Sequence, residues 1–180
     1  GCGDAAAARA VFSEIKQALA GPLLWNSSVG MFMPASGNNA HLIDVWGSAL
    51  AVELGLLTAE REKQVVAWFG ANWASVVQSG QIRHLPQGQY WPNTLFWEHD
   101  VYQNGGYWGT ASGWVLPVIA RNDSAVAVQL VRDAIADARM NGLNEWKNSE
   151  FCCNCRGAAV WTSLCQTPYP STASLQGVRQ

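Results

Sequence analysis

Apolar residues recur at helical spacing along most of this chain, in two different patterns. Three segments are apolar on one face and polar elsewhere, which is typical of helices buried on one side. They are residues 5–19, 58–79 and 124–140. Residues 40–54 and 110–120 are apolar nearly all round, which is typical of interior helices. A shorter apolar segment, residues 157–164, predicts a sixth helix.

Polar residues and glycines mark the predicted ends of these helices. Side chains that can accept hydrogen bonds from the first N–H groups of a helix precede four of the segments. The predicted N-caps are Asp4, Asn39, Thr58 and either Asp123 or Ser124, and the predicted stops are Gly21, Gly55 and Gly142. The apolar faces of the first and fifth helices are predicted to be buried. They comprise Val11, Phe12, Ile15 and Leu19 in one and Val128, Val131, Ile135 and Ala138 in the other.

One-sided and wholly apolar helices alternate along the chain, with long loops before the apolar ones. This order predicts an all-α fold of concentric helical hairpins, an α/α toroid with its ligand site at one end. About three hairpins form only part of such a ring, so we expect a partial toroid over residues 1–165 and an irregular tail over 166–180. The open ends predict marginal stability or self-association. A short β-hairpin is also predicted within residues 81–91, with Pro86-Gln-Gly88 as its turn.

Composition narrows the range of functions. The 180 residues carry 11 Lys and Arg against 13 Asp and Glu, and no basic stripe is present that would follow nucleic acid. No apolar run reaches the roughly 20 residues of a membrane-spanning helix. We therefore predict neither nucleic acid nor membrane as a partner. Ten Trp exceed what packing alone requires, and tryptophan is favoured where an apolar face meets a polar ligand.

The five cysteines and the start of the chain bear on metal binding and on compartment. Cys152 and Cys155 have Cys-x-x-Cys spacing, but only Cys2 and Cys165 could supply a second pair of ligands. Ordinary thiols or a disulfide are therefore favoured over zinc, and we predict no metal and no cofactor. The chain starts at Gly1 without a signal-type segment, so we expect the natural start to be missing and the compartment stays unknown.

A neutral, aromatic loop is the candidate ligand site. Gly105 and Gly106 permit tight backbone turns, and aromatic and amide side chains surround them. Rings cover the apolar C–H faces of a sugar, while amides exchange hydrogen bonds with its hydroxyl groups. We therefore predict that a mono- or oligosaccharide binds at Tyr102, Gln103, Asn104, Tyr107 and Trp108.

Three stretches of the sequence resemble the six-hairpin glycosidase-like superfamily of (α/α)6 toroids. They are Asp-Val-Trp-Gly-Ser-Ala-Leu-Ala-Val at 44–52, Gly-Gln-Ile-Arg-His-Leu-Pro at 80–86 and Tyr-Gln-Asn-Gly-Gly-Tyr-Trp at 102–108. The resemblance covers roughly residues 25–148 and implies a carbohydrate ligand and acid/base hydrolysis of O-glycosidic bonds. The first two stretches add four candidate substrate-binding residues, namely Asp44, Trp46, Arg83 and His84.

Glycoside hydrolysis requires two carboxylates, one as acid and one as nucleophile or base. Glu98 is a candidate acid because aromatic neighbours would raise its pKa; alternatively it is an exposed carboxylate paired with His99 or Arg83. Glu145 lies in a segment similar to one of trehalase-like and glucosidase-like members, and it is a candidate base or a ligand of a sugar hydroxyl; alternatively it fixes its loop. Asp44 either contacts the sugar or makes a structural hydrogen bond, which we favour slightly.

Two departures from the family pattern keep other functions open. Residues 155–161 carry no carboxylate, although trehalase-like relatives have a catalytic glutamate in the corresponding segment. The earlier hairpins that supply the proton donor of many relatives are also absent. The alternatives are a non-catalytic carbohydrate-binding remnant and, less favoured, a sugar epimerase that would use His41, His84 or His99.

Overall fold

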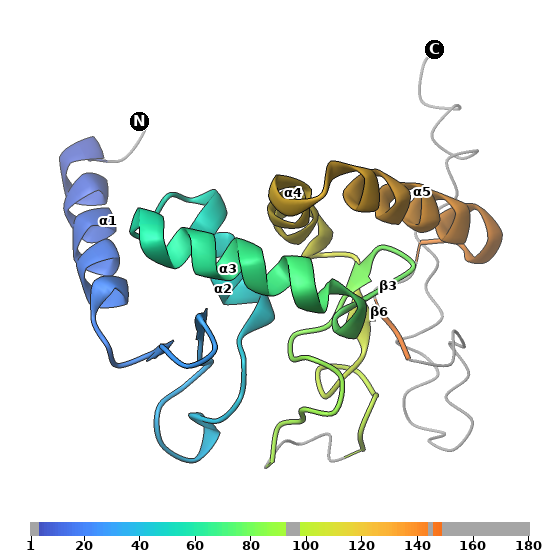
Figure 1. The fold of residues 1–180 in the computed structure, drawn as a ribbon, viewed down its shortest axis with the longest axis horizontal. Helices are drawn as coiled ribbons and strands as arrows, with labels where there is room; N and C mark the ends of the chain where they lie inside the picture. Colours follow the sequence, from blue (N-terminus) through green and yellow to red (C-terminus); the bar gives the residue numbers. More distant parts are fainter. Residues whose placement is uncertain (1–3, 93–97, 144–145, 149–180) are drawn as a thin grey trace.

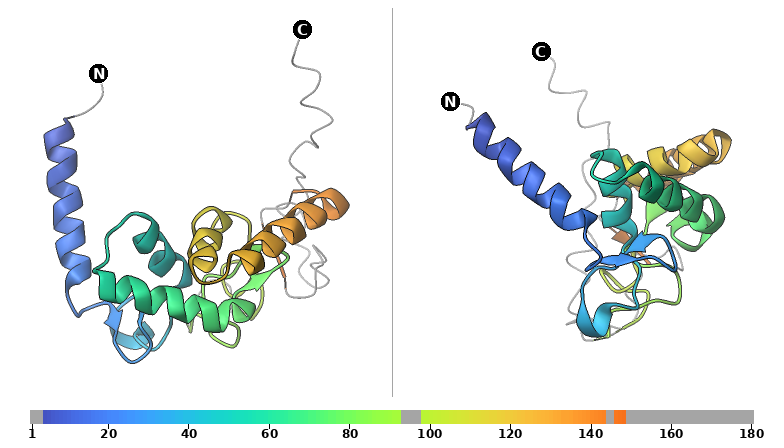
Figure 2. Two further views of the ribbon diagram at one scale, coloured as in Figure 1. Left: turned by 45° about the horizontal axis from the view of Figure 1, so that its top comes forward. Right: turned by 60° about the vertical axis from the view of Figure 1, so that its left-hand side comes forward.

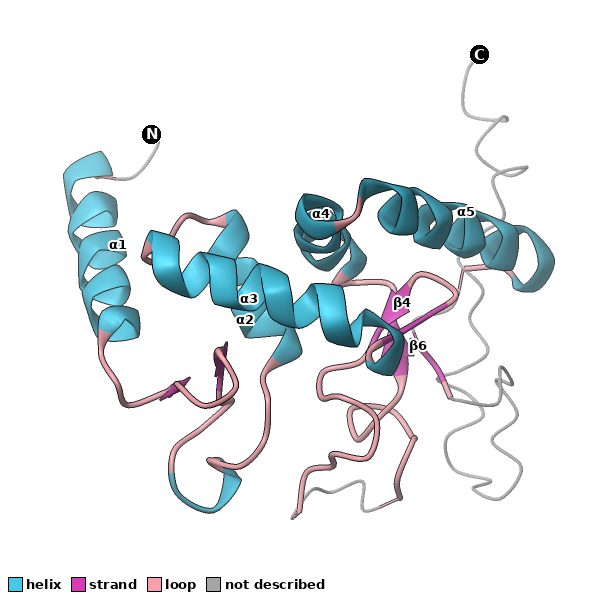
Figure 3. Cartoon of the chain, in the orientation of Figure 1, coloured by secondary structure: helices cyan, strands magenta, loops and turns pink. Residues whose placement is uncertain are grey.

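A computed structural model of the chain describes residues 4–92, 98–143 and 146–148. Five α-helices and two small antiparallel sheets form this part of the protein (Figures 1 and 3). The α-helices are α1 (Ala5–Ala20), α2 (Val45–Glu53), α3 (Ala59–Asn72), α4 (Ser112–Asn122) and α5 (Ser124–Asn141). Two short 3-10 helices are η1 (Gly37–Asn39) and η2 (Trp73–Ser75).

The sheets are built from strands of two residues each. β1 (Trp25–Asn26) pairs with β2 (Met31–Phe32). The second sheet has the order β3 (Val77–Gln78), β4 (Gln81–Ile82), β5 (Tyr107–Trp108) and β6 (Trp146–Lys147). In its register Ile82 lies opposite Trp108, and Trp108 lies opposite Trp146. The sheet therefore places two tryptophans from distant parts of the chain side by side.

The hydrophobic core lies where α2, α3 and α4 pack together. A Cβ atom on Gly70 of α3 would lie only 2.5 Å from the side chain of Asn122, so this glycine allows α3 and α4 to approach closely. The most deeply buried apolar side chains include Val45, Val65, Phe69, Val115 and Val118. Among the described residues, no helix combines the length and the hydrophobicity needed to cross a membrane.

A buried ion pair ties α5 to the four-stranded sheet. The carboxylate of Asp137 accepts hydrogen bonds from Gln81 Nε2 at 3.0 Å, from Asn141 Nδ2 at 2.8 Å and from Lys147 Nζ. Asp137 and Lys147 are both buried, so each supplies the charge that the other needs away from water. The pair fixes β4, α5 and β6 relative to one another.

The predicted all-α toroid is wrong. The described residues form a mixed α/β structure, because segments between the helices pair as strands rather than remaining loops. The predicted burial of the apolar faces of the first and fifth helices is also wrong. The Phe12 side chain of α1 is 45% exposed and the Ile135 side chain of α5 is 47% exposed, and their apolar neighbours on the same faces are similarly exposed. α5 instead buries the neighbouring face that contains Ala127 and Leu130.

The predicted helix starts are correct at three positions and wrong at one. Asp4, Thr58 and Asp123 each accept hydrogen bonds from the first N–H groups of their helices, as predicted. Asn39 caps nothing, because α2 begins later and Asp44 Oδ1 accepts from the N–H of Gly47 at 2.8 Å. The predicted helix over 58–79 is too long, since α3 ends at Asn72 and gives way to η2.

The predicted β-hairpin within residues 81–91 is misplaced. The observed hairpin joins β3 to β4 through Ser79 and Gly80, whose φ angles are 48° and 70°. Positive φ at both central residues is the geometry of a type I′ turn, which matches the twist of two-residue hairpins. The predicted helix at 157–164, the tail at 166–180, Glu145 and the five cysteines lie outside the described residues.

Candidate functional site: an aromatic cluster beside a buried arginine

The aromatic residues of four elements meet beside the four-stranded sheet. Trp46 of α2 stacks on His84, which follows β4, with ring centroids 3.6 Å apart and planes 28° apart. Trp108 of β5 and Trp114 of α4 present their edges to Trp46 at 6.3 and 6.1 Å. Tyr102 extends the group, because its ring lies 4.9 Å from that of Trp108 and 5.8 Å from that of Trp146 on β6. We call these six side chains the aromatic cluster.

Backbone hydrogen bonds at the start of α2 position Trp46. The N–H of Asp44 donates to the carbonyl oxygen of Phe32 at 2.8 Å, and the N–H of Val45 donates to that of His84 at 3.1 Å. The second bond joins the start of α2 directly to the residue that stacks on Trp46. The stack therefore follows from the way the N-terminus of α2 is attached to the end of β4.

The cluster has an enclosed side and a side that solvent reaches. Trp108 and Trp146 are buried, whereas Trp46, His84, Tyr102 and Trp114 are half-buried. Half-buried aromatic rings offer an apolar surface to a ligand without the backbone having to move. The accessible surface is thus formed by residues of α2, α4 and two loops.

Two buried polar atoms of the cluster lack hydrogen-bond partners among the described residues. They are Trp46 Nε1 and His84 Nδ1. The other indoles near Trp46 contrast with it, since Trp108 Nε1 donates to the carbonyl oxygen of Tyr102 and Trp114 Nε1 to that of Trp46, both at 3.2 Å. A buried polar atom without a partner costs about 1–3 kcal/mol, so these two nitrogens are the polar groups of the cluster that a further hydrogen bond would stabilise.

Burial shifts the pKa values of two titratable groups at this site in the direction of the neutral form. Desolvation lowers the pKa of His84 to about 4, so its imidazole is neutral near pH 7. Desolvation raises the pKa of Asp44, although hydrogen bonds from the N–H groups of Gly47 and Trp46 oppose that rise. The site therefore favours neutral hydrogen-bonding groups over charged ones.

Arg83 forms a second buried group that adjoins the cluster. Its Nη1 donates to Asp100 Oδ1 at 2.8 Å, and its guanidinium lies 5.7 Å from the ring centroid of Tyr90 and 5.4 Å from that of Tyr107. Tyr90 Oη donates to the same carboxylate. A Cβ atom on Gly105 would lie 2.7 Å from Arg83 Nη2, so glycine at this position leaves room for the arginine. We call these residues the arginine knot.

The loop before β5 is folded tightly against the arginine knot. Asp100 and Tyr102 adopt positive φ angles of 63° and 46°, which are uncommon for residues other than glycine. The side chain of Asn104 is buried, and its Oδ1 accepts a hydrogen bond from the N–H of Trp91 at 2.8 Å. Asn104 therefore fixes its own loop, which sets the position of the Tyr102 ring.

The structure brings together four of the residues singled out from the sequence and separates the others. Trp46, His84, Tyr102 and Trp108 belong to the aromatic cluster, and Asp44 is the N-cap of the helix that carries Trp46. Arg83, Asn104 and Tyr107 belong to the arginine knot and its loop, and Gln103 and Glu98 are exposed. Arg83 pairs with Asp100 and not with Glu98, so the predicted alternative of a Glu98–Arg83 pair is wrong.

Sequence reasoning missed two members of the cluster, Trp114 and Trp146. Trp114 lies in a segment that was recognised only as an interior helix, although a tryptophan near the start of such a helix is a signal for the edge of a site. Trp146 follows the candidate base Glu145 in the sequence and was not itself singled out as a site residue. The pairing of β5 with β6 brings Trp146 to Trp108. It could not be predicted, because strands of two residues are too short to show an alternating pattern in the sequence.

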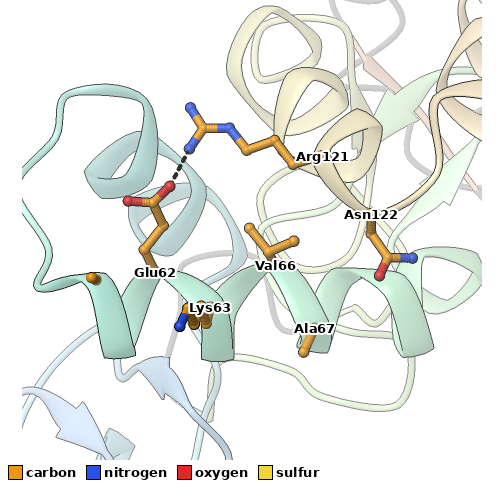
Figure 4. Close-up of a pocket in the computed structure, with 7 residues that line it drawn as sticks. Glu62, Lys63, Val66, Ala67, Arg121 and Asn122 are labelled. Atoms are coloured by element: carbon orange, nitrogen blue, oxygen red, sulfur yellow. Dashed lines mark hydrogen bonds and ion pairs between the residues drawn. The ribbon is translucent and has the colours of Figure 1, made fainter.

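A shallow hollow lies away from the aromatic cluster, between α3 and α4 (Figure 4). It has a volume of about 490 Å³, and Glu62, Lys63, Val66 and Arg121 are among its lining residues. Arg121 bridges two carboxylates, at 2.6 Å from Glu62 and at 2.8 Å from Glu53. The hollow is therefore bordered by an ion-pair bridge on the surface and lacks the convergent, enclosed polar groups typical of a ligand site.

The described residues contain no cluster of three or more His, Cys, Asp or Glu side chains arranged to hold a metal ion. Comparison of the chain with models of protein families, with curated proteins and with solved structures finds no match.

Proposed function

We propose that the aromatic cluster binds a neutral carbohydrate. The observation that carries this proposal is the half-exposed stack of Trp46 on His84, in which Trp46 Nε1 and His84 Nδ1 are buried without partners among the described residues. A sugar offers apolar C–H faces that pack on the indole and hydroxyl groups that pair with both nitrogens.

The electrostatics of the cluster supports a neutral ligand over an ionic one. His84 is uncharged near pH 7 because burial lowers its pKa to about 4. The guanidinium of Arg83 is fully buried and already paired with Asp100, so it is not accessible to an anionic ligand. Hydroxyl groups, which both donate and accept hydrogen bonds, match a neutral imidazole and an indole N–H.

Isothermal titration calorimetry with a panel of neutral oligosaccharides tests the proposal. We expect Trp46→Ala to weaken binding by about 1–3 kcal/mol, because it removes both the stacking surface and the N–H donor. Trp46→Phe keeps a ring and should lose less. Trp68→Phe is the matched control, since Trp68 packs edge-on against Phe69 outside the cluster. If no oligosaccharide binds, or if Trp46→Ala binds as tightly as the wild type, the proposal is wrong.

Hydrolysis of O-glycosidic bonds at this site is a second candidate function, favoured by one observation. Burial raises the pKa of Asp44, against the opposing hydrogen bonds from the N–H groups of Gly47 and Trp46, and Asp44 would be one of the two carboxylates that hydrolysis requires. Asp44 lies two residues before Trp46, at the edge of the cluster. The chain should then release reducing ends from a bound oligosaccharide, and Asp44→Asn should abolish the release while binding persists.

The roles first assigned to other residues stay predictions. Glu98 is exposed and Glu145 lies outside the described residues, so a catalytic pair formed by them remains to be tested by mutation. An epimerase would need more than one group for proton transfer. Of the three histidines, His84 lies in the cluster, while His41 and His99 are exposed, and no observation favours that function over carbohydrate binding.

A further inference from the structure

β6 carries one residue of the aromatic cluster and, next to it, one residue of the buried ion pair. The ring of Trp146 lies 5.8 Å from that of Tyr102, and Lys147 pairs with Asp137 of α5. Successive side chains of a strand point to opposite faces of a sheet, so the two residues contact different neighbours. α5 passes beside the four-stranded sheet, where Asp137 meets Lys147 (Figures 1 and 2). β6 therefore connects α5 to the aromatic cluster.

The backbone pairing of β6 is too short to fix its own register. β6 is an outer strand that pairs with β5 over two residues, and Trp108 lies opposite Trp146 in this pairing. A slip of one residue would exchange the faces, so that Trp146 would point away from the cluster and Lys147 toward the aromatic rings. The observed register therefore depends on interactions of the side chains.

The ion pair disfavours the slipped register. Asp137 is 8% exposed and Lys147 is 3% exposed, so moving Lys147 away would leave the carboxylate buried without its cation. Gln81 of β4 and Asn141 of α5 also donate to Asp137, which gives the carboxylate a fixed position against which β6 is aligned. Selecting one register is the best-attested role of a polar or ionic group in a protein interior.

The position of Trp146 affects the accessible surface of the cluster through Tyr102. Trp146 is buried, and a Cβ atom on Gly106 would lie 2.9 Å from its Cε3, so the ring packs closely on the loop that contains Tyr102. Tyr102 is half-buried and belongs to the surface that solvent reaches. A displaced Trp146 would remove an aromatic contact from Tyr102 and leave its ring less firmly placed.

We propose that the ion pair of Asp137 and Lys147 is a register lock, which holds Trp146, and through it Tyr102, in the aromatic cluster. Asp137 and Lys147 are then positioning residues, because they act through Trp146 and not by touching a ligand. The effect of the lock on ligand affinity rests on the proposed carbohydrate site, whereas the register of β6 does not depend on any ligand.

Variants of the full chain separate a register lock from a contribution to stability alone. Lys147→Met leaves the Asp137 carboxylate buried and unpaired, so it should destabilise the fold. Asp137→Asn combined with Lys147→Met removes both charges and should recover most of the stability, because neutral replacement of a buried ion pair is often tolerated. This double variant should not recover the register, because methionine has no specific partner. Arg121→Met is the matched control, since it removes ion pairs on the surface away from the cluster.

Fluorine NMR of the chain labelled with fluorotryptophan reports the register, and Trp146→Phe identifies the Trp146 signal among those of the ten Trp. This signal should be single in the wild type and unchanged in Arg121→Met, and it should move or split in the double variant. Isothermal titration calorimetry should show an oligosaccharide affinity that is lower by about 2- to 30-fold in the double variant. The affinity of Arg121→Met should equal that of the wild type.

Two outcomes would overturn the proposal. If the double variant keeps the wild-type Trp146 signal, the ion pair contributes to stability alone. If the signal moves but the affinity does not change, Trp146 does not shape the ligand surface. Asp137→Asn alone keeps an acceptor for Gln81 and Asn141 and is the second variant if the double variant does not fold; its Trp146 signal should also move. A wild type that binds no oligosaccharide would contradict the proposed function, and the Trp146 signal would still decide whether the register lock exists.

Discussion

Arg83 and His84 are neighbours at the end of β4, yet they enter two environments with opposite chemistry. Arg83 is fully buried, and its charge is matched by Asp100 and by two tyrosine rings. His84 is half-buried, neutral and stacked on Trp46. Both side chains retain buried nitrogens without partners among the described residues. The difference lies in exposure, because solvent reaches part of the His84 side chain whereas the Arg83 side chain is fully buried.

Arg83 therefore supports the fold, whereas His84 belongs to the proposed carbohydrate site. The arginine knot holds the loop before β5, and the loop in turn positions Tyr102 at the aromatic cluster. Changes in the knot should therefore alter stability first, while changes in the cluster should alter ligand binding first. The predictions that follow test this division.

The largest expected effect is that of Arg83→Met. The substitution keeps much of the side-chain volume but leaves Asp100 without its buried partner, and we expect a loss of about 2–4 kcal/mol in the free energy of unfolding. The estimate lies below the full cost of an unpaired buried charge, because the Asp100 side chain is 35% exposed and stays partly hydrated. Urea denaturation measures the loss. Arg132→Met, on the exposed face of α5, is the control, and equal stability of the two variants would contradict the prediction.

An intermediate effect concerns the pH dependence of stability. The pKa of His84 is about 4 in the folded chain against an ordinary value of 6.5. Between these two pH values the folded state therefore binds fewer protons than the unfolded state. The stabilisation of the fold by neutral His84 is fully present above pH 6.5 and is lost as the pH falls toward 4. We expect a loss of about 1–3 kcal/mol over this range.

The His84 contribution can be isolated by a matched pair of variants. His84→Phe keeps an aromatic ring against Trp46 but cannot titrate, so its unfolding free energy should depend less on pH between 6.5 and 4 than that of the wild type. His41→Phe removes an exposed histidine and should leave the dependence unchanged. Identical pH profiles for the wild type and His84→Phe would show that His84 is not held neutral by burial.

The smallest expected effect is that of Ser79→Gly in the hairpin that precedes both Arg83 and His84. Ser79 has a φ angle of 48°, which glycine adopts without steric cost, and we expect a gain of about 0.5 kcal/mol in stability. Ser27→Gly, at an exposed position without positive φ, should instead destabilise the chain slightly. If the proposed carbohydrate site is correct, the affinity of the chain for an oligosaccharide should not change. A loss of stability in Ser79→Gly would mean that its side chain has a role beyond the turn.

Local features of the fold could be predicted from the sequence, since the interactions that create them span a few residues. Asp4, Thr58 and Asp123 precede helices whose first N–H groups they satisfy. The start of α2 was misplaced because both Asn39 and Asp44 are good capping residues, and sequence alone does not rank them. In the structure Gly37–Asn39 form η1. The N–H of Asp44 donates to the carbonyl oxygen of Phe32 in β2, and α2 begins directly after Asp44.

Long-range features could not be predicted in the same way. The type I′ turn at Ser79 and Gly80 carries a recognisable Ser-Gly signal, but Pro86 and Gly88 suggested a later turn. The stack of Trp46 on His84 depends on the attachment of α2 to the end of β4, and two-residue strands carry no alternating pattern that would reveal it. Tyr102 and Trp108 could be found as aromatic residues in a neutral loop, but not as partners of α2.

The aromatic cluster joins residues that are synthesised at very different times, so it can form only late in the synthesis of the chain. Trp114 Nε1 donates to the carbonyl oxygen of Trp46, 68 positions away, and Trp146 joins the cluster through Tyr102. Contacts between residues so far apart form slowly, because long loops must close before they stabilise anything. A ribosome adds about 5–20 residues per second, so several seconds separate the emergence of Trp46 from that of β6. Until β6 emerges the nascent chain lacks Trp146, so we expect the aromatic cluster to be completed only after nearly all of the described residues have been synthesised.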